Sequence, residues 1–204
     1  MRLGILGGSF NPPHVGHLLL ASDSFDTLGL DRLLIIPAFA NPLKEIADGT
    51  PLPEQRMEMA SLTFGPDPRF AVSSMEIDRG GLSYTVDTLD SLTVAHPGAE
   101  LILLIGMDAW RTLNHWKAPA RIRRLATLAV FSRGLDVVPV GVTAVTTRRI
   151  DVSSSEIRHR VANGSTIRGF VTESVERYIN DEKLYAGTAP ADGIPAMVRG
   201  NGNA

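Results

Sequence analysis

The chain has 204 residues, of which 44% are hydrophobic and 21% are charged, and its formal net charge at pH 7 is -2. This length and composition predict one globular domain with a substantial core, and they exclude a disordered or fibrous protein. Because the net charge is slightly negative, no nucleic-acid partner is expected. The chain contains no cysteine, which excludes disulfides, thiolate nucleophiles and thiolate metal sites.

Short apolar runs alternate with longer amphipathic runs along the chain, which is typical of βαβ units with a mostly parallel sheet. The sequence therefore predicts an α/β fold: a single doubly wound, Rossmann-like domain with helices flanking the sheet. In chain order we expect a strand at 3–6, a helix at 17–28, a strand at 32–37, a helix at 53–64, a strand at 70–77, a helix at 84–95, a strand at 101–105, helices at 108–116 and 119–125, strands at 127–131 and 142–150, and helices at 154–162 and 172–181.

The predicted domain covers residues 1–186. From residue 187 the sequence GTAPADGIPAMVRGNGNA has no periodicity, which predicts a flexible C-terminal tail. The N-terminal run MRLGILGG reaches glycines too early for a secretion signal, and LLIIPAFA and LILLIG are far shorter than the roughly 20 residues of a membrane span. We therefore expect a cytoplasmic protein without membrane contact.

Ligands of such a sheet bind at the carboxyl ends of its strands. The segments that follow the predicted strands are GGSFNPPHVGH, AFANPLKE, SMEIDRGGLSYT, GMDAW and SRG. None contains GxxxxGK[ST], and no GxGxxG follows the first strand, so neither a P-loop enzyme nor a standard dinucleotide-binding protein is indicated.

The first of these segments has the chemistry of a phosphate site. Glycines let the backbone approach a phosphate, and a helix N-terminus presents free N–H groups and partial positive charge to an anion. His14 and His17 lie one turn apart and can reach the same oxygens. The alternatives are half of a metal site, for which only three other histidines exist in unrelated settings, and a purely structural turn. The candidates here are Gly7, Gly8, Ser9, Phe10, His14, Gly16 and His17.

A second anion site is predicted where Ser153, Ser154 and Ser155 stand at the start of the predicted helix at 154–162. Serines at a helix start cap it and direct N–H and O–H donors at an anion. Arg158, one turn further on, can form two hydrogen bonds with phosphate oxygens. For this segment alone, an ordinary N-cap followed by a surface arginine is the alternative.

Together these segments resemble a known superfamily. GSFNPPHVGH is similar to the GxFxPxHxGH motif of the nucleotidylyltransferases, and VSSSEIR to their ISSTxxR motif. The middle of the chain, SMEIDRGGLSYTVDTL, GMDAWRTLNHW and IPAFANPLK, resembles the bacterial nicotinate mononucleotide adenylyltransferases, as does VERYINDEKLY near the end. The resemblance extends from residue 1 to about residue 186. Ser155 replaces the usual threonine of the second motif, and both side chains carry the hydroxyl.

The resemblance implies two groups of binding residues. On the nicotinate mononucleotide side, Trp116 offers a stacking face to the pyridine and Lys44 a charge to the phosphate, while the helix start at Tyr84 offers N–H groups to the carboxylate. Alternatively, Trp116 is a packing residue and Lys44 an unremarkable exposed lysine. The mononucleotide candidates are Lys44, Ser83, Tyr84, Thr85 and Trp116.

On the ATP side the resemblance adds Gly106, Asp108 and Arg133. Asp108 can accept hydrogen bonds from a ribose; its alternative role is the N-cap of the next helix. Arg133 stands in SRG, where the family has Arg-Pro-Gly, so this loop lacks the proline that restricts its backbone in the family.

The implied reaction transfers the adenylyl group of ATP to nicotinate mononucleotide. Its catalytic candidates are His14, His17, Lys44 and Arg158, with Mg²⁺ carried by the ATP phosphates and no metal-binding residue. An enzyme that prefers nicotinamide mononucleotide or another small phosphate acceptor is the nearer alternative, and a non-catalytic nucleotide-binding protein the more distant one. A homo-oligomer is left open.

Overall fold

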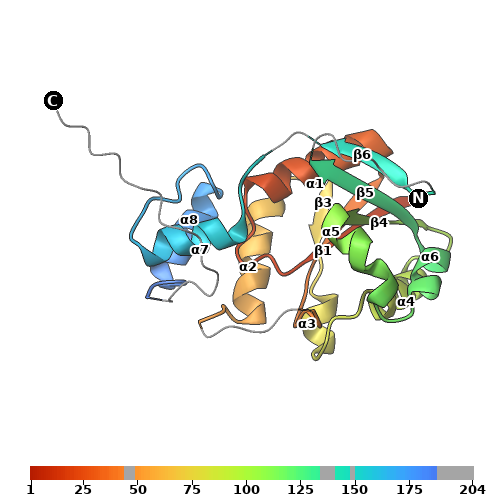
Figure 1. Ribbon diagram of the computed structural model, residues 1–204, viewed down its shortest axis with the longest axis horizontal. Coiled ribbons are helices and arrows are strands. Elements are labelled where there is room, and N and C mark those ends of the chain that lie inside the picture. The colour runs from red at the N-terminus through yellow and green to blue at the C-terminus, as the bar shows by residue number, and fades with distance from the viewer. Residues whose placement is uncertain (44–48, 134–140, 148–149, 188–204) are drawn as a thin grey trace.

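The computed structural model describes residues 1–43, 49–133, 141–147 and 150–187. Its centre is a sheet of six parallel strands in the order β3-β2-β1-β4-β5-β6 (Figure 1). The chain builds the sheet outward from β1 to β3 and then returns to place β4 on the other side of β1. The strands are β1 (Arg2–Gly8), β2 (Arg32–Pro37), β3 (Phe70–Val72), β4 (Glu100–Gly106), β5 (Thr127–Arg133) and β6 (Thr143–Thr147).

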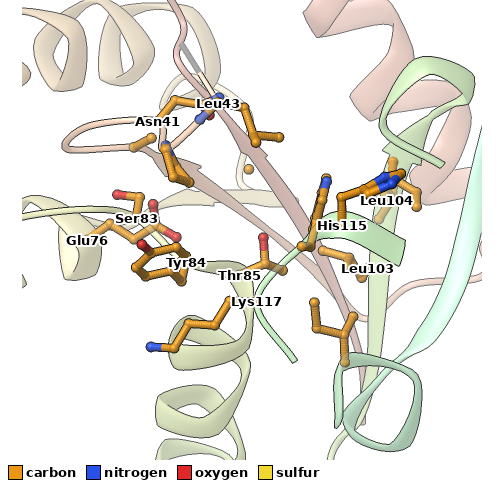
Figure 2. Close-up of a pocket in the computed structure, with 17 residues that line it drawn as sticks. Asn41, Leu43, Glu76, Ser83, Tyr84, Thr85, Leu103, Leu104, His115 and Lys117 are labelled. Atoms are coloured by element: carbon orange, nitrogen blue, oxygen red, sulfur yellow. The ribbon is translucent and has the colours of Figure 1, made fainter. Parts of the chain in front are cut away.

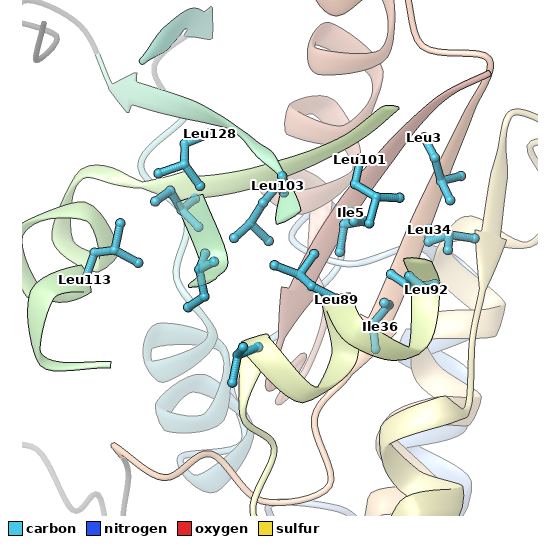
Figure 3. Packing of buried hydrophobic residues seen from close by; sticks show 14 of the residues in the cluster. Leu3, Ile5, Leu34, Ile36, Leu89, Leu92, Leu101, Leu103, Leu113 and Leu128 are labelled. Carbon is cyan, nitrogen blue, oxygen red and sulfur yellow. The ribbon is translucent and has the colours of Figure 1, made fainter. Parts of the chain in front are cut away.

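Helices cover both faces of this sheet, which explains why its inner strands are apolar at consecutive positions. α1 (Val15–Leu28) and α2 (Pro53–Phe64) contribute to the core on one face. α4 (Thr85–Ala95) and α6 (Pro119–Leu125) contribute to the core on the other, where Leu89 and Leu92 pack on strand leucines and isoleucines (Figure 3). The predicted doubly wound α/β architecture is confirmed.

A third apolar cluster joins α7 (Ser154–Ala162) and α8 (Glu173–Asp181) to α2. Figure 1 shows this helix pair beside α2, away from the sheet. Met59 of α2 and Ile157 of α7 are both fully buried in the cluster. α2 thus packs on the sheet with one side and on α7 and α8 with the other, which fixes the second serine motif relative to the sheet.

The predicted strand at 70–77 is wrong in its second half. β3 pairs with β2 over three residues and stops at Val72, because the chain turns into a helix whose N-cap is Ser74. The backbone N–H of Ser73 makes one more bond, 2.9 Å to the Ile35 carbonyl. The following MEIDR forms the short helix α3 (Met75–Arg79), which ends where Gly80 adopts a φ of 68°.

The predicted helix at 108–116 is also shorter and divided. α5 (Met107–Thr112) passes into the 3-10 turn η1 (Leu113–His115), and Trp116 is extended. The first helix begins at Val15 rather than at residue 17, with His14 as its N-cap. Of the predicted strand at 142–150, residues 148–149 lie outside the described residues, as do residues 188–204 of the predicted tail. In the part of the chain that the structure describes, no helix has the length and apolarity needed to cross a membrane.

Candidate functional site

A cavity of about 190 Å³ lies where the sheet reverses its strand order. Gly7 and Gly8 at the end of β1 form part of its wall, and Ile105 near the end of β4 forms another part. The loop after β2, the turn before α4 and the loop after η1 complete it (Figure 2). This is the place at which parallel α/β sheets bind ligands.

The four mononucleotide candidates within the described residues, Ser83, Tyr84, Thr85 and Trp116, all line this cavity. In Figure 2, Ser83 and Tyr84 lie on one side of it and His115 on another. The fifth candidate, Lys44, lies outside the described residues. The structure therefore brings together residues that are more than thirty positions apart in the sequence.

Hydrogen bonds to the loop after β2 hold the turn before α4. Ser83 donates its backbone N–H to the Ala40 carbonyl at 2.8 Å, and its Oγ accepts the Phe39 N–H at 3.0 Å. Tyr84 is the N-cap of α4 and Thr85 its first residue, so the N-terminus of this helix meets the cavity.

Trp116 packs against the core and also lines the cavity. It is half-buried against the core cluster under α4 and α6, and its ring also forms part of the cavity wall. Its Nε1 donates to the Thr112 Oγ1 at 3.4 Å. An aromatic ring held by packing on one side offers its other surface to a ligand without much further loss of side-chain freedom.

The two histidines of the first motif stack on each other, with ring centroids 3.8 Å apart. The His14 N–H donates to Nδ1 of His17 at 3.2 Å, so in the neutral His17 ring the proton is on Nε2. Gly16 leaves room beside them, because a Cβ there would lie 3.0 Å from the His14 ring, which would then have to shift. Phe10 packs edge-on against His17 at 5.3 Å between centroids. The motif thus presents His17 as an Nε2–H donor of fixed orientation.

The second motif contacts the first, although about 140 residues separate them in the sequence. The Ser154 Oγ donates to the Pro12 carbonyl at 2.8 Å, and Nη1 of Arg158 donates to the Asn11 carbonyl at 2.9 Å. Nη2 of Arg158 also donates to the Ser155 Oγ at 3.1 Å. The interpretation of Arg158 as a surface arginine is therefore wrong. The N-cap interpretation is confirmed for Ser153, whose Oγ accepts the Glu156 N–H at 3.1 Å.

Arg56 was not predicted, yet it links two of the loops that form the site. It is only 5% exposed, and its guanidinium donates to the carbonyls of Ser9, Ala38 and Phe39 at 2.9, 2.6 and 2.7 Å. Burial lowers the pKa of this guanidinium. A signal for it exists in the sequence, because Arg56 has helical spacing with the apolar Met59.

Tyr185 is the second unpredicted residue, and it contacts the loop after β1. Its hydroxyl donates to Oδ1 of Asn11 at 2.8 Å. Burial raises the pKa of this hydroxyl far above its usual value, so it remains a donor at neutral pH. Tyr185 is the last residue of VERYINDEKLY, a segment that resembles the family, but it follows α8 without a periodic pattern that would indicate its burial.

The remaining ATP-side candidates are separate from these contacts. Gly106 is the N-cap of α5, and a Cβ there would lie 3.1 Å from the Phe131 ring. Asp108 lies in the first turn of α5 with a fully exposed side chain and pairs with Arg111 at 3.1 Å. The alternative that Asp108 is the N-cap is therefore wrong. Arg133 is the last residue of β5, in register with Thr147 of β6.

The cavity wall also includes Glu76, His115 and Lys117, which the sequence did not indicate. Glu76 is 7% exposed and accepts a 2.5 Å hydrogen bond from the Thr88 hydroxyl. Lys117 follows Trp116 directly and lies over the Tyr84 ring. Among the residues that the structure describes, no three histidines or carboxylates cluster as metal ligands.

Comparison with known proteins gives consistent results. The cytidylyltransferase-like family model matches residues 5–160. A probable nicotinate-nucleotide adenylyltransferase of Gemmatimonas aurantiaca is 42% identical, over 91% of this chain and 92% of that relative. A protein of the same description from Thermus thermophilus is 41% identical, over 91% of this chain and all of its own length.

Among solved structures, the Plasmodium falciparum nicotinic acid mononucleotide adenylyltransferase complexed with NaAD has a similar fold. Its TM-score is 0.75 at 16% identity, over 90% of this chain and 97% of that one. A likeness at this identity supports the fold, whereas the family model and the bacterial relatives cover most of the sequence itself. The chain therefore belongs to the cytidylyltransferase-like family and, within it, to the nicotinate-nucleotide adenylyltransferases.

Proposed function

We propose that this protein transfers the adenylyl group of ATP to nicotinate mononucleotide, giving nicotinate adenine dinucleotide and pyrophosphate for NAD biosynthesis. One observation carries the proposal: the cavity at the reversal of strand order joins the glycine end of β1 to the Ser83–Thr85 turn and Trp116. A flat ring that bears a carboxylate matches this combination of an aromatic wall and a helix N-terminus.

Within this proposal the pyridine stacks on Trp116, and its carboxylate accepts hydrogen bonds from backbone N–H groups at the start of α4. Ser83, Tyr84 and Thr85 form that end of the site. We assign Lys44 to the mononucleotide phosphate. ATP lies along the phosphate-binding segments, which are Gly7, Gly8, Ser9, Phe10, His14, Gly16 and His17 after β1, Gly106 and Asp108 after β4, Arg133, and Ser153, Ser154, Ser155 and Arg158 at the start of α7.

In the reaction a phosphate oxygen of the mononucleotide attacks the α-phosphorus of ATP, and the bond from that phosphorus to the bridging oxygen of pyrophosphate breaks. The attacking oxygen is already anionic, so no general base is needed. His17 donates from Nε2 to the phosphate oxygens as charge moves to the leaving group, and His14 keeps the His17 ring oriented. Lys44 and Arg158 supply positive charge. Holding two anions in line for attack contributes roughly 7–11 kcal/mol of the barrier reduction.

Mg²⁺ enters in this proposal on the ATP phosphates, since this ion keeps several of its waters and binds mainly through substrate oxygens. Its contribution is to neutralise phosphate charge. The proposal further includes a cytoplasmic location, no nucleic-acid partner and a catalytic unit of residues 1–186. A chain that ends at residue 186 is expected to retain full turnover.

The test is pyrophosphate release from ATP and Mg²⁺ with nicotinate mononucleotide, nicotinamide mononucleotide or phosphopantetheine as acceptor. Release with the acid mononucleotide well above the other two is the expected result. Greater release with nicotinamide mononucleotide would change the proposed substrate and leave the proposed adenylyl transfer intact. Binding of ATP without release from any acceptor would overturn the proposal in favour of a nucleotide-binding protein.

A further inference from the structure

An ion pair lies beside the helix start that faces the cavity. Nζ of Lys117 is 2.9 and 2.8 Å from the two carboxylate oxygens of Asp87, and it lies 4.6 Å from the centre of the Tyr84 ring. Lys117 follows Trp116 and lines the cavity with it. Figure 2 shows the Lys117 side chain beside Tyr84. Asp87 is in the first turn of α4, two residues after Thr85.

The position of Asp87 is electrostatically unusual for a site that accepts a carboxylate. A helix N-terminus has a positive potential because its first N–H groups point outward, and an acidic residue in the first turn cancels this potential. An unpaired Asp87 would therefore oppose a second carboxylate at Tyr84 and Thr85. Lys117 is close enough to neutralise Asp87, which leaves the positive potential of the helix available to a ligand.

We propose that the Lys117–Asp87 pair determines the preference for the acid over the amide mononucleotide. This inference rests on the proposed function, since it concerns the same cavity and the same substrates. Lys117 is a specificity-determining residue here: its charge acts on the pyridine substituent through Asp87. The two mononucleotides differ in that substituent and share their phosphate, so the ratio of their binding constants isolates this effect.

Single and double substitutions give effects of opposite sign. Lys117→Gln leaves a negative charge at the helix start and is expected to lower the acid-to-amide ratio of kcat/KM by roughly three- to tenfold. Asp87→Asn leaves a positive charge and should raise the ratio by a similar factor. The double variant removes both charges and should return the ratio to near that of the wild type. These values require measurement at low ionic strength.

A structural role predicts a different pattern. If Lys117 only supported the Tyr84 ring, both substrates would suffer equally and the double variant would be worse than either single one. Salt provides a second readout, because the screening length falls from about 10 Å at 0.1 M to about 3 Å at 1 M ionic strength. The differences between the variants should shrink over that range. Loss of ring support would not depend on salt in this way.

The chain offers a matched control in a neighbouring ion pair. Arg121 of α6 binds Asp90 of α4 through Nε at 3.0 Å and Nη2 at 2.8 Å, and neither residue lines the cavity. Arg121→Gln also removes one positive charge from beside α4. Its partner Asp90 lies three residues farther from the start of this helix than Asp87 does. This variant should leave the acid-to-amide ratio close to that of the wild type.

Failure of the inference differs from failure of the proposed function. Wild-type turnover of the acid mononucleotide with an unchanged ratio in Lys117→Gln would overturn the inference alone. No wild-type turnover with either mononucleotide would overturn the proposed function. Calorimetric dissociation constants for the two mononucleotides need no turnover, and opposite shifts of their ratio in the two single variants would still support the role of the pair.

Discussion

The two ends of the candidate site are built in different ways. At the proposed phosphate end, the loop after β1 is held by buried or half-buried side chains that donate to its backbone, namely Arg56, Ser154 and Arg158. At the proposed pyridine end, the wall includes Trp116, which is half-buried against the core, and the exposed Lys117 that follows it. Reacting phosphates need fixed donors, whereas the substrate ring needs a surface and a suitable charge. Substitutions at the two ends should therefore fail in different ways.

The largest effect is expected at the phosphate end. His17→Ala removes the oriented Nε2 donor and should lower kcat by about 10²–10³-fold, the range for losing one transition-state donor. The change in KM for the mononucleotide should be small. Steady-state pyrophosphate release measures both values, with the thermal unfolding midpoint as the control for folding. Full turnover in this variant would show that His17 has no catalytic role.

Arg56 tests whether the phosphate end depends on its buried support. Arg56→Met should lower the free energy of unfolding by about 3 kcal/mol, because three carbonyls lose their donor in a buried place. Arg56→Lys should recover only part of this loss, since a single ammonium cannot reach both loops as the guanidinium does. Urea unfolding measures these values. Equal stability of Arg56→Met and the wild type would contradict this account.

Trp116 tests the pyridine end. Trp116→Ala should raise KM for the mononucleotide by about tenfold and leave kcat nearly unchanged, because stacking stabilises the bound ring equally before and during the reaction. Trp116→Phe keeps a smaller ring and should lie between the two. A fall in kcat with an unchanged KM would mean that Trp116 acts in the transition state, as His17 is proposed to do, and would contradict the contrast between the two ends of the site.

The smallest effect is expected from Tyr185→Phe, which removes the donor to Asn11 and should cost about 1 kcal/mol of unfolding free energy. The pKa of this tyrosine is raised in the folded protein, so its contribution is complete at neutral pH. It should decline above a pH of about 10, where only the unfolded chain ionises this group. Urea titrations of both proteins at neutral and alkaline pH measure the difference. A constant difference across that range would contradict a raised pKa.

Much of this molecule was predictable because its signals are local. The alternation of apolar and amphipathic runs predicted α1, α2, α4 and α6, and the end of the helix at Leu28 follows from Gly29. The strand at 70–77 was predicted too long because residues 75–77 belong to the short helix α3 instead. A helix of five residues is too short for its period to be distinguished from that of a strand.

The sequence by itself determined the α/β class, the two phosphate-type motifs and the residues around Trp116, since each depends on residue types at short spacing. Only the tertiary structure decided that Ser154 and Arg158 bind the loop of the first motif, that Arg56 and Tyr185 support it, and that Lys117 neutralises Asp87. Those contacts join residues up to 174 positions apart. Their geometry arises from two packing arrangements: α7 and α8 pack on α2, and α4 packs on the sheet. No local pattern specifies either arrangement.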